Sequence, residues 1–563
     1  MSTLEPWLTH YPKGVDFNRS FTPRPVFDLI TDAARDFPAR PCTSFLGKTM
    51  TYAEMAGHVR HAAKGLQTLG VGKGTRVGLF LPNCPTFIVG YYAVLMAGGT
   101  VVNFNPLYSL DELEHQVRDS GTELMVTLNL RALFGKVETL MQRGVLKRAV
   151  VASFPALLPT VKATLFKLAK GKELANIAAS PVSSQVIGQA QLMVNDGKPV
   201  PVTIDPMNDL AVLQYTGGTT GVPKGAMLTH ANVSINVQQV RDWAGLLTPG
   251  HEKVMAILPF FHVFGMTVVM NFGVQQAAEL ILMPRFEITE AMRLIASSKP
   301  TCLPGVPTLF NAILNHRLAK TTNMRSLKFC FSGGAALPLE VKRDFEALTG
   351  AKLIEGYGLS ETSPVLSGNP MDGPVKEGSI GLPFPGTIIS IRSLDDPAKE
   401  MPLGEDGEIC VAGPQVMPGY WRQPEETAAV FTGKFFRTGD IGHMDSEGFT
   451  FIVDRLKDMI NTSGFKVYPR RIEEVLYEHE AVEEVIVLGM PDKYRGEAPR
   501  AYVKLREGKA ATPQALMEFI RPKLSRHELP DAIELRASLP KTAIGKLSKK
   551  DLKAEVMAAL KAG

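Results

Sequence analysis

A strand, a helix and a second strand follow one another early in the sequence, and this unit limits the fold more than any other feature. Arg76–Leu81 is a short apolar run that ends at Pro82, as a buried strand does. A helix is expected over Thr86–Ala97 and the second strand over Thr100–Asn105. Further strand candidates are Leu124–Leu128 and Ala149–Val151, and Thr51 followed three residues later by Glu54 predicts the capped start of another helix. Strands alternating with helices at this spacing predict a doubly wound α/β architecture.

The length of the chain requires more than one domain. At 563 residues it is too long for a single hydrophobic core. After about residue 380 the sequence becomes rich in β-type residues and turns, and its last part has a compact α/β pattern of its own. We predict an N-terminal body over residues 1–456, with doubly wound α/β subdomains and a β-rich subdomain. Residues 457–563 are predicted to form a small mobile α+β lid, hinged at Lys457.

Charge and cysteine content exclude several classes of protein. The net charge is only +5, which gives nucleic-acid binding no support. The 5 cysteines are scattered without a CxxC pair, so neither a disulfide framework nor a zinc site is expected. The N-terminus lacks the basic start and apolar core of a signal peptide, and no apolar run is long enough to span a bilayer. These features predict a cytoplasmic protein.

The segment Phe154–Ala178 admits two interpretations. Leu158, Val161, Leu165 and Leu168 fall near one face of a helix, with lysines interspersed. One interpretation is a surface helix packed on the body. The other is a basic amphipathic segment that lies on anionic lipid, which would make the protein peripheral on the inner face of the membrane.

The glycine-rich stretch Tyr215–Gly225 is the strongest local sign of ligand binding. Its glycines allow backbone N–H groups to turn inward and its threonines add hydroxyl donors, so it can wrap a polyphosphate. A Walker-type loop is excluded, because Pro223 precedes Lys224 and Gly225 follows it. The residues expected to bind phosphate are Thr216, Gly217, Gly218, Thr219, Thr220, Gly221 and Lys224.

The loop and several later motifs resemble the adenylate-forming AMP-binding enzymes, which include acyl-CoA synthetases, luciferases and peptide-synthetase adenylation domains. The motifs occur in the family order, and the resemblance covers nearly the whole chain. It implies an α/β body with a lid, and a reaction in which a carboxylate attacks ATP to give an acyl-adenylate. The later motifs are Pro259–Gly265, Ser332–Leu337, Gly356–Thr362, Phe436–Asp440 and Pro540–Lys546.

The resemblance implies a nucleotide seat. Tyr357 offers an aromatic face to adenine, and Ser360 can donate a hydrogen bond to the α-phosphate. Asp440 is placed to accept hydrogen bonds from both ribose hydroxyls, and Arg455 to contact ribose or phosphate. Small residues let the flat base lie against the backbone; these are Gly333, Gly334, Ala335, Gly356 and Gly358.

Three residues are implied to take part in catalysis. Lys546 would neutralise charge that builds up as the carboxylate attacks phosphorus. Glu361, with Thr216, is expected to hold Mg²⁺, because a hard cation on phosphates prefers oxygen ligands. His262 is expected to shape the acyl pocket rather than move protons.

The remaining implied roles concern the acyl group, the hinge and coenzyme A. The acyl pocket is expected to use Phe264, Gly265, Met266 and Val306, which together are small-sided and apolar. Lys457 lies where the family places its hinge. The residues expected to face coenzyme A after the lid turns are Gly464, Phe465 and Lys466.

Within the family, the sequence looks closest to bacterial long-chain fatty-acid–CoA ligases. The stretches Phe104–His115 and Asp440–Ile460 carry this likeness. It implies an AMP-forming acid–thiol ligase whose substrates are a long- or medium-chain fatty acid, ATP with Mg²⁺, and coenzyme A. An acyl-AMP ligase that loads a carrier protein, and a non-catalytic binding protein of the same fold, are the alternatives. A membrane surface and a second copy of the chain in a homodimer are further candidate partners.

Overall fold

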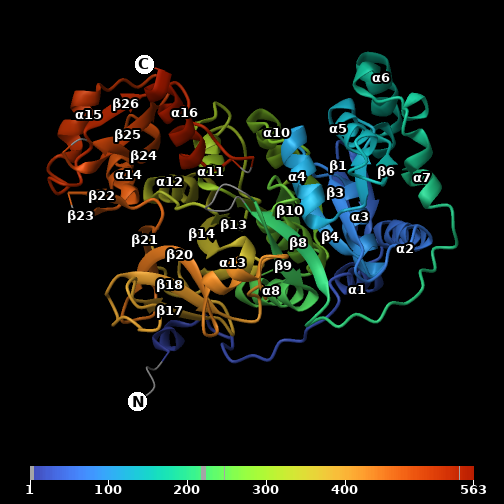
Figure 1. Ribbon diagram of the computed structural model, residues 1–563, viewed down its shortest axis with the longest axis horizontal. Coiled ribbons are helices and arrows are strands. Elements are labelled where there is room, and N and C mark those ends of the chain that lie inside the picture. The colour runs from blue at the N-terminus through green and yellow to red at the C-terminus, as the bar shows by residue number, and fades with distance from the viewer. Residues whose placement is uncertain are drawn as a thin grey trace.

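The fold is a large body with a smaller C-terminal unit seated on one side (Figure 1). The computed structural model describes residues 5–216, 223–245, 247–463, 465–492, 494–543 and 545–562. Four sheets organise these residues. Two of them have long parallel cores and form the body.

The first body sheet contains the strand–helix–strand unit expected from the sequence. Its strands are ordered β7-β6-β5-β3-β4-β8-β9. All neighbours pair in parallel except β8 and β9, which are antiparallel. The strands are β3 (Arg76–Phe80), β4 (Thr100–Phe104), β5 (Leu124–Leu128), β6 (Arg148–Ala152), β7 (Val186–Gly188), β8 (Leu210–Thr216) and β9 (Lys224–Thr229). Since β4 and β5 are buried at every position, their continuous apolar runs are those of strands covered on both faces.

The second body sheet carries the site. Its order is β16-β15-β14-β13-β12-β10-β11-β1-β2. The run from β14 to β1 is parallel, so the carboxyl ends of its strands meet at one edge. The strands are β1 (Pro41–Phe45), β2 (Lys48–Thr51), β10 (Lys253–Ala256), β11 (Glu279–Leu282), β12 (Cys302–Gly305), β13 (Phe329–Gly333), β14 (Lys352–Gly358), β15 (Val365–Gly368) and β16 (Leu382–Pro383). The doubly wound α/β prediction is confirmed.

Helices cover the two body sheets, and their caps follow the sequence. Thr51 and Glu54 form the capping box predicted at the start of α2. The other helices of the body are α1 (Asp28–Asp36), α3 (Pro85–Met96), α4 (Leu110–Ser120), α5 (Arg131–Gln142), α6 (Thr160–Lys170), α7 (Gln189–Leu192), α8 (His230–Trp243), α9 (Phe272–Gln275), α10 (Ile288–Ser298), α11 (Pro307–Asn315) and α12 (Leu339–Thr349), with α2 over Tyr52–Thr68. Among the helices of the described residues, none combines the length and apolar character needed to cross a bilayer.

A β-rich part follows the body, as the sequence predicts. It is an antiparallel sheet of order β17-β18-β20-β19, with β21 paired to β20. The elements are β17 (Ile388–Arg392), β18 (Gly407–Ala412), α13 (Pro424–Ala429), β19 (Phe431–Thr432), β20 (Phe435–Met444) and β21 (Thr450–Arg455).

The C-terminal unit has hydrophobic clusters of its own. One contains Ile460, Ile472 and Leu516, and a second contains Tyr502 and Leu552. The elements are β22 (Ile460–Thr462), β23 (Phe465–Val467), α14 (Pro469–Tyr477), β24 (Val482–Asp492), β25 (Gly496–Leu505), α15 (Pro513–Ile520), β26 (Ala532–Leu535) and α16 (Lys549–Ala562). Separate clusters are what a lid domain needs in order to move as a unit; its boundary at residue 457 and its mobility stay predictions.

Candidate active site

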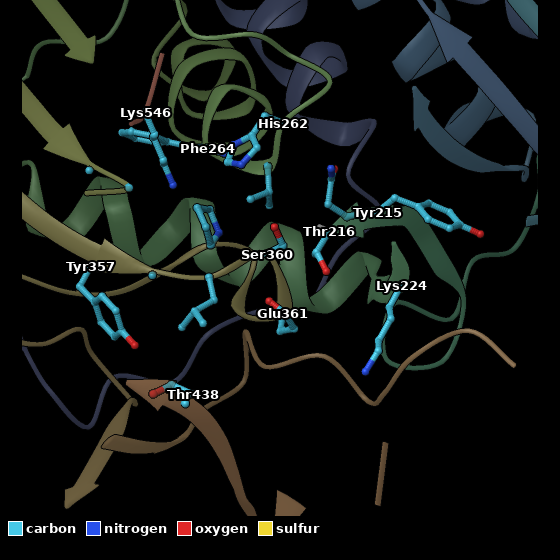
Figure 2. Close-up of a pocket in the computed structure, with 18 of the residues that line it drawn as sticks. Tyr215, Thr216, Lys224, His262, Phe264, Tyr357, Ser360, Glu361, Thr438 and Lys546 are labelled. Carbon is cyan, nitrogen blue, oxygen red and sulfur yellow. The ribbon is translucent and has the colours of Figure 1, made fainter. Parts of the chain in front are cut away.

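A cavity of about 720 Å³ lies where the body, the β-rich part and the C-terminal unit meet (Figure 2). Its floor is the carboxyl edge of β13 and β14, and the segment before α16 reaches it from the C-terminal unit. The structure brings residues from separated motifs to this one cavity. Those on its wall are Thr216, Lys224, His262, Phe264, Gly333, Gly334, Gly356, Tyr357, Gly358, Ser360, Glu361, Arg455, Lys457 and Lys546.

The two ends of the glycine-rich loop are held together by strand pairing. Thr216 at the end of β8 lies opposite Lys224 at the start of β9. The Lys224 side chain is nearly buried; its ammonium group pairs with Glu426 and lies 5.4 Å from the centre of the Tyr420 ring. Both ends of the loop therefore face the cavity. The expected phosphate contacts Gly217, Gly218, Thr219, Thr220 and Gly221 lie outside the described residues.

The glycines of the proposed nucleotide seat are required by packing. Gly333 and Gly356 are paired neighbours on β13 and β14. A Cβ on Gly333 would come within 3.1 Å of the Phe264 ring, and one on Gly356 would overlap the Phe331 ring. Aromatic rings of the protein itself therefore pack on the bare backbone at Gly333 and Gly356, and the contact of adenine with these glycines stays a prediction. Ala335 is exposed and lies outside the cavity wall.

Asp440 lies directly behind the wall. It is only 2% exposed, and it is paired in register with Arg455 across β20 and β21. Tyr357 Oη donates a hydrogen bond of 2.6 Å to one carboxylate oxygen, and Arg455 Nε lies 2.9 Å from the other. Burial raises the pKa of Tyr357, so its hydroxyl stays protonated as a donor. Both oxygens of Asp440 are thus already engaged.

Glu361 is a partly buried carboxyl group on the wall of the cavity. It lies on the short turn η7 (Ser360–Thr362). Tyr420 Oη donates a hydrogen bond of 2.8 Å to Glu361 Oε1. Burial raises the pKa of Glu361, and among the described residues no Lys, Arg or His lies within salt-bridge distance of it. A carboxylate that lacks a cationic partner in the protein is suited to bind a metal cation that enters the site together with a ligand.

Lys546 enters the cavity from the C-terminal unit. Two hydrogen bonds join α11 to the C-terminal unit near this lysine: Thr308 Oγ1 donates to the Gly545 carbonyl at 2.6 Å and Asn311 Nδ2 to the Glu483 carbonyl at 3.3 Å. Figure 2 shows the ammonium end of Lys546 directed inward. Burial, with Arg455 nearby, lowers the pKa of Lys546 to about 8, and Asp440 acts in the opposite direction.

His262 is neutral in this site. The backbone N–H of Phe264 donates a hydrogen bond of 3.2 Å to His262 Nδ1, which fixes that nitrogen as an acceptor. Burial, with Lys546 nearby, lowers the pKa of His262 to about 3. A ring that stays uncharged at neutral pH suits the expected role in shaping the pocket.

The expected acyl residues do not all reach the cavity. Phe264 lines it, and its ring meets that of Phe331 edge-on at 5.8 Å. Gly265 and Met266 are buried in the π-helical turn η6 (Gly265–Asn271), away from the wall, and Val306 lies beside Gly545. A smaller apolar cavity of about 20 Å³ lies behind Phe331, which lines both cavities. Its other walls are Val240, Trp243, Ala244, Val254, Val268, Phe272, Cys302, Pro304, Phe329, Ile354, Met371 and Phe384.

Comparisons with known proteins decide the family. The AMP-binding enzyme family matches residues 30–421, which is more than half of the chain, and the AMP-binding enzyme C-terminal domain matches residues 471–546. The chain belongs to the AMP-binding enzyme family.

Relatives and solved structures agree with this assignment. The chain is 42% identical to a long-chain-fatty-acid–CoA ligase of Bacillus subtilis over 98% of each chain, and 37% identical to one of Escherichia coli over 98% of each. The structure is also similar to that of ATP-bound MatB from Rhodopseudomonas palustris. That match has a TM-score of 0.82 and 26% identity, and covers 94% of this chain and 98% of the other.

Several residues on the cavity wall of this AMP-binding enzyme were not among those predicted from the sequence. Tyr420 donates a hydrogen bond to Glu361. The only feature of the sequence that could have indicated a site at this position is the pair of aromatic residues, Tyr420 and Trp421, that follows a glycine. Phe331 was not predicted to line the site because it lies just before the motif Ser332–Leu337 and not within it. Further wall residues that were not predicted include Asn103, Tyr108, Gln214, Thr438 and Thr542.

The residues expected to face coenzyme A lie away from the cavity in this closed arrangement. Phe465 is 57% exposed and stacks on His527 with ring centres 4.9 Å apart. Lys466 is exposed beside it on β23, and Gly464 lies outside the described residues. Their role is a prediction about a second lid orientation.

Proposed function

We propose that this AMP-binding enzyme is an AMP-forming fatty-acid–CoA ligase. It activates a long- or medium-chain fatty acid as the acyl-adenylate and then transfers the acyl group to coenzyme A. The placement of Lys546 carries the proposal: a lysine from the C-terminal unit lines the same cavity as Thr216 and Glu361, which belong to the body. The names of the relatives support the choice of fatty acid as substrate.

In the first half-reaction a carboxylate oxygen attacks the α-phosphorus of ATP, and pyrophosphate leaves with the electron pair of the broken P–O bond. Negative charge increases between two anions as this bond forms. Lys546, charged below its pKa of about 8, neutralises that charge. Ser360 lies on the same wall as a donor for the α-phosphate, and the neutral His262 excludes water without taking a proton.

Magnesium fits the donor set of the site. Glu361 supplies a buried carboxylate oxygen without a cationic partner among the described residues, and the Thr216 side chain lines the same cavity. Mg²⁺ bound there would neutralise phosphate charge on ATP. We assign Thr216 and Glu361 as its protein ligands, with Tyr420 fixing the Glu361 carboxylate.

The second half-reaction needs Lys546 removed and coenzyme A admitted. A rotation of residues 457–563 about Lys457 would do both, because the separate hydrophobic clusters of this unit let it turn without losing its own packing. The thiol sulfur attacks the acyl carbon, and the bond from that carbon to the phosphate oxygen breaks. AMP leaves with the electron pair of that bond, and the thiol proton passes to solvent. Residues 464–466 would then lie along the entering pantetheine arm.

The apolar cavity of about 20 Å³ behind Phe331 would receive only the end of the alkyl tail. Phe264 and Phe331 form the apolar end of the main cavity, and no charged side chain lines the space beyond. The tail would displace the Phe331 ring and extend toward Val268 and Cys302. This revises the pocket expected from sequence, which placed Met266 and Val306 on its wall.

Exchange of pyrophosphate into ATP tests the proposal, with a panel of carboxylates and with and without coenzyme A. We expect exchange with fatty acids, and release of AMP only when coenzyme A is present. Exchange restricted to aryl or amino acids would exclude the fatty-acid assignment. Adenylate that is discharged by an acyl-carrier protein but not by coenzyme A would favour the carrier-loading alternative, and no exchange with any acid would favour a binding protein.

The Lys546→Ala variant separates the half-reactions. It should abolish exchange while leaving the reaction of supplied acyl-AMP with coenzyme A within about twofold of wild type, because Lys546 leaves the site before that step. Lys553→Ala, an exposed lysine on α16, is the matched control. Equal loss of both half-reactions would refute the assigned role.

Peripheral attachment to the membrane and a homodimer belong to the same proposal. Fatty acids partition into bilayers, so an enzyme that activates them gains access to substrate at the surface. Light scattering after gel filtration tests the homodimer, which a monomeric mass at micromolar concentration would exclude.

A further inference from the structure

Helix α6 carries an apolar stripe that faces water. In this helix over Thr160–Lys170 no residue is buried. Val161 is 72% exposed, Leu165 58% and Leu168 80%. These three positions are four and three residues apart, so they lie on one face of the helix. Figure 1 shows α6 at the edge of the molecule, outside the sheets.

The opposite face of α6 attaches it to the body. Ala163 and Phe166 are partly buried against the core, and the Phe166 ring lies 4.9 Å from that of Phe154. Helix α6 is therefore a surface helix packed on the body, as one interpretation of the sequence expected, but it packs through a face other than the predicted stripe. Of the four apolar residues predicted to form the stripe, only Leu158, which precedes the helix, is buried. Because the inner face is already occupied, the stripe is available to another surface.

The charged side chains of α6 itself are all basic, and the nearest acidic residue along the chain, Glu173, follows the helix and pairs with Lys170 at 3.3 Å. Residues 139–172 contain no Asp or Glu. On the helix, Lys162 and Lys167 project from opposite sides of the stripe. Lys162 also donates a hydrogen bond of 2.8 Å to the Leu46 carbonyl, which joins α6 to the turn between β1 and β2. The seven basic residues of this stretch are Arg143, Lys147, Arg148, Lys162, Lys167, Lys170 and Lys172.

We propose that the outer face of α6, with Leu46 and Lys48 of the adjoining turn, lies on an anionic lipid surface. Leu46 is 37% exposed, and Lys48 donates to the Ala156 carbonyl beside α6 at 2.9 Å. An interfacial helix buries its apolar side chains where the lipid headgroups meet the acyl chains, and its lysines extend to the lipid phosphates. The outer face of α6 has this arrangement of side chains. An acidic protein surface would complement the lysines but not three exposed aliphatic side chains. The inference names the surface for the proposed peripheral attachment and does not depend on the ligase chemistry.

Flotation of the full-length protein with vesicles tests the proposal. The probes are vesicles of phosphatidylcholine alone and of phosphatidylcholine with phosphatidylglycerol. We expect binding to the anionic vesicles only, and release when salt is raised from about 0.1 M to about 1 M, since screening shortens from about 10 Å to about 3 Å. Equal binding to both vesicle types, or to neither, would overturn the proposal.

Two variants locate the contact. V161S/L165S/L168S removes the stripe, and K167Q/K170Q/K172Q removes charge; each should weaken anionic-vesicle binding about fivefold or more. The matched controls are V194S/V200S/M207S, at similarly exposed apolar positions, and K198Q/K299Q/K320Q. Controls that lose as much binding as the α6 variants would overturn the assignment.

Two further readouts keep the outcome unambiguous. Pyrophosphate exchange with octanoate, which is soluble, should be unchanged in the α6 variants, because α6 is remote from the cavity residues; this also shows that they are folded. If wild type fails in exchange but floats with anionic vesicles, the proposed function fails and the surface stands. If the stripe variant changes only the oligomeric mass, the face is a contact between two copies and the lipid proposal is wrong.

Discussion

Lys546 of the C-terminal unit lies against the bare backbone of Gly334 in the body. A Cβ placed on Gly334 would come within 2.6 Å of the Lys546 ammonium nitrogen. Gly334 also has φ of +84°, where side chains are disfavoured. Lys546 can therefore occupy this position only because Gly334 has no Cβ atom.

Gly334→Ala should lower adenylation about a hundredfold, because the methyl group displaces Lys546 from the developing charge. The reaction of supplied acyl-AMP with coenzyme A should change little. Gly350→Ala is the control: Gly350 has φ of +74° but nothing within 4 Å of its Cβ, so it carries the backbone strain without the contact. A Gly334→Ala enzyme whose pyrophosphate exchange stays within about twofold of the Gly350→Ala control would contradict the mechanism.

Local features of the fold were predictable because short-range physics determines them. The predicted strand Leu124–Leu128 matches β5 at both ends, and the capping box of Thr51 and Glu54 is present. The strand is indicated by a continuous apolar run, and the helix start by a capping residue three positions before its partner. Both patterns involve only residues that are close together in the sequence. The order of the motifs similarly predicted which residues would meet in one cavity.

Other features depend on contacts that the sequence does not display. The hydrogen bond from Tyr420 to Glu361 joins residues in different parts of the fold. Met266 was expected on the cavity wall, but η6 is π-helical, and its wider turns leave that side chain buried beside Asn103. The stripe on α6 has helical spacing, yet only the packing of Phe166 shows that it faces outward.

Adenylation should depend on pH through Lys546. Its pKa is lowered to about 8, so the ammonium form is present below that pH and is lost as pH rises through it. The kcat/KM for ATP in pyrophosphate exchange should therefore fall above about pH 8. The alkaline fall in kcat should occur at a higher pH, because the phosphates of bound ATP stabilise the protonated form of Lys546 and raise its pKa. His262, with a pKa of about 3, contributes nothing between pH 5 and 8.

Lys546→Arg checks this assignment, because arginine stays protonated over the whole range. Whatever activity the variant keeps should show no alkaline fall near pH 8, whereas Lys553→Arg should behave as wild type. A fall that persists in the Lys546→Arg profile would assign the titration to another group.

Tyr420→Phe should raise the Mg²⁺ concentration needed for half-maximal exchange about tenfold. The hydroxyl positions the Glu361 carboxylate through a bond of 2.8 Å, and removing such an outer partner of a metal ligand typically costs a factor of 10–100 in affinity. Tyr108→Phe, on the same cavity wall, is the control. An unchanged magnesium requirement in Tyr420→Phe, measured by titration at fixed ATP, would argue against Glu361 as the ligand.

The cavity behind Phe331 should set the length of acyl chain that the enzyme accepts. Cys302→Phe would fill a space of about 20 Å³ and exclude the end of a long tail. Losing burial of two CH₂ groups costs about 1.6 kcal/mol, so the ratio of kcat/KM for hexadecanoate to that for octanoate should fall about tenfold or more. Phe331→Ala should raise the same ratio by opening the passage between the two cavities.

This ratio is measured within one enzyme preparation, so partial unfolding of a variant cancels. Phe310→Ala removes an equally buried ring outside both cavities and should leave the ratio within about twofold of wild type. If Cys302→Phe and Phe331→Ala leave the ratio unchanged, the tail takes another route. The tail would then run past Asn105 and Tyr108, which also line the main cavity, and substitutions there would shift the ratio instead.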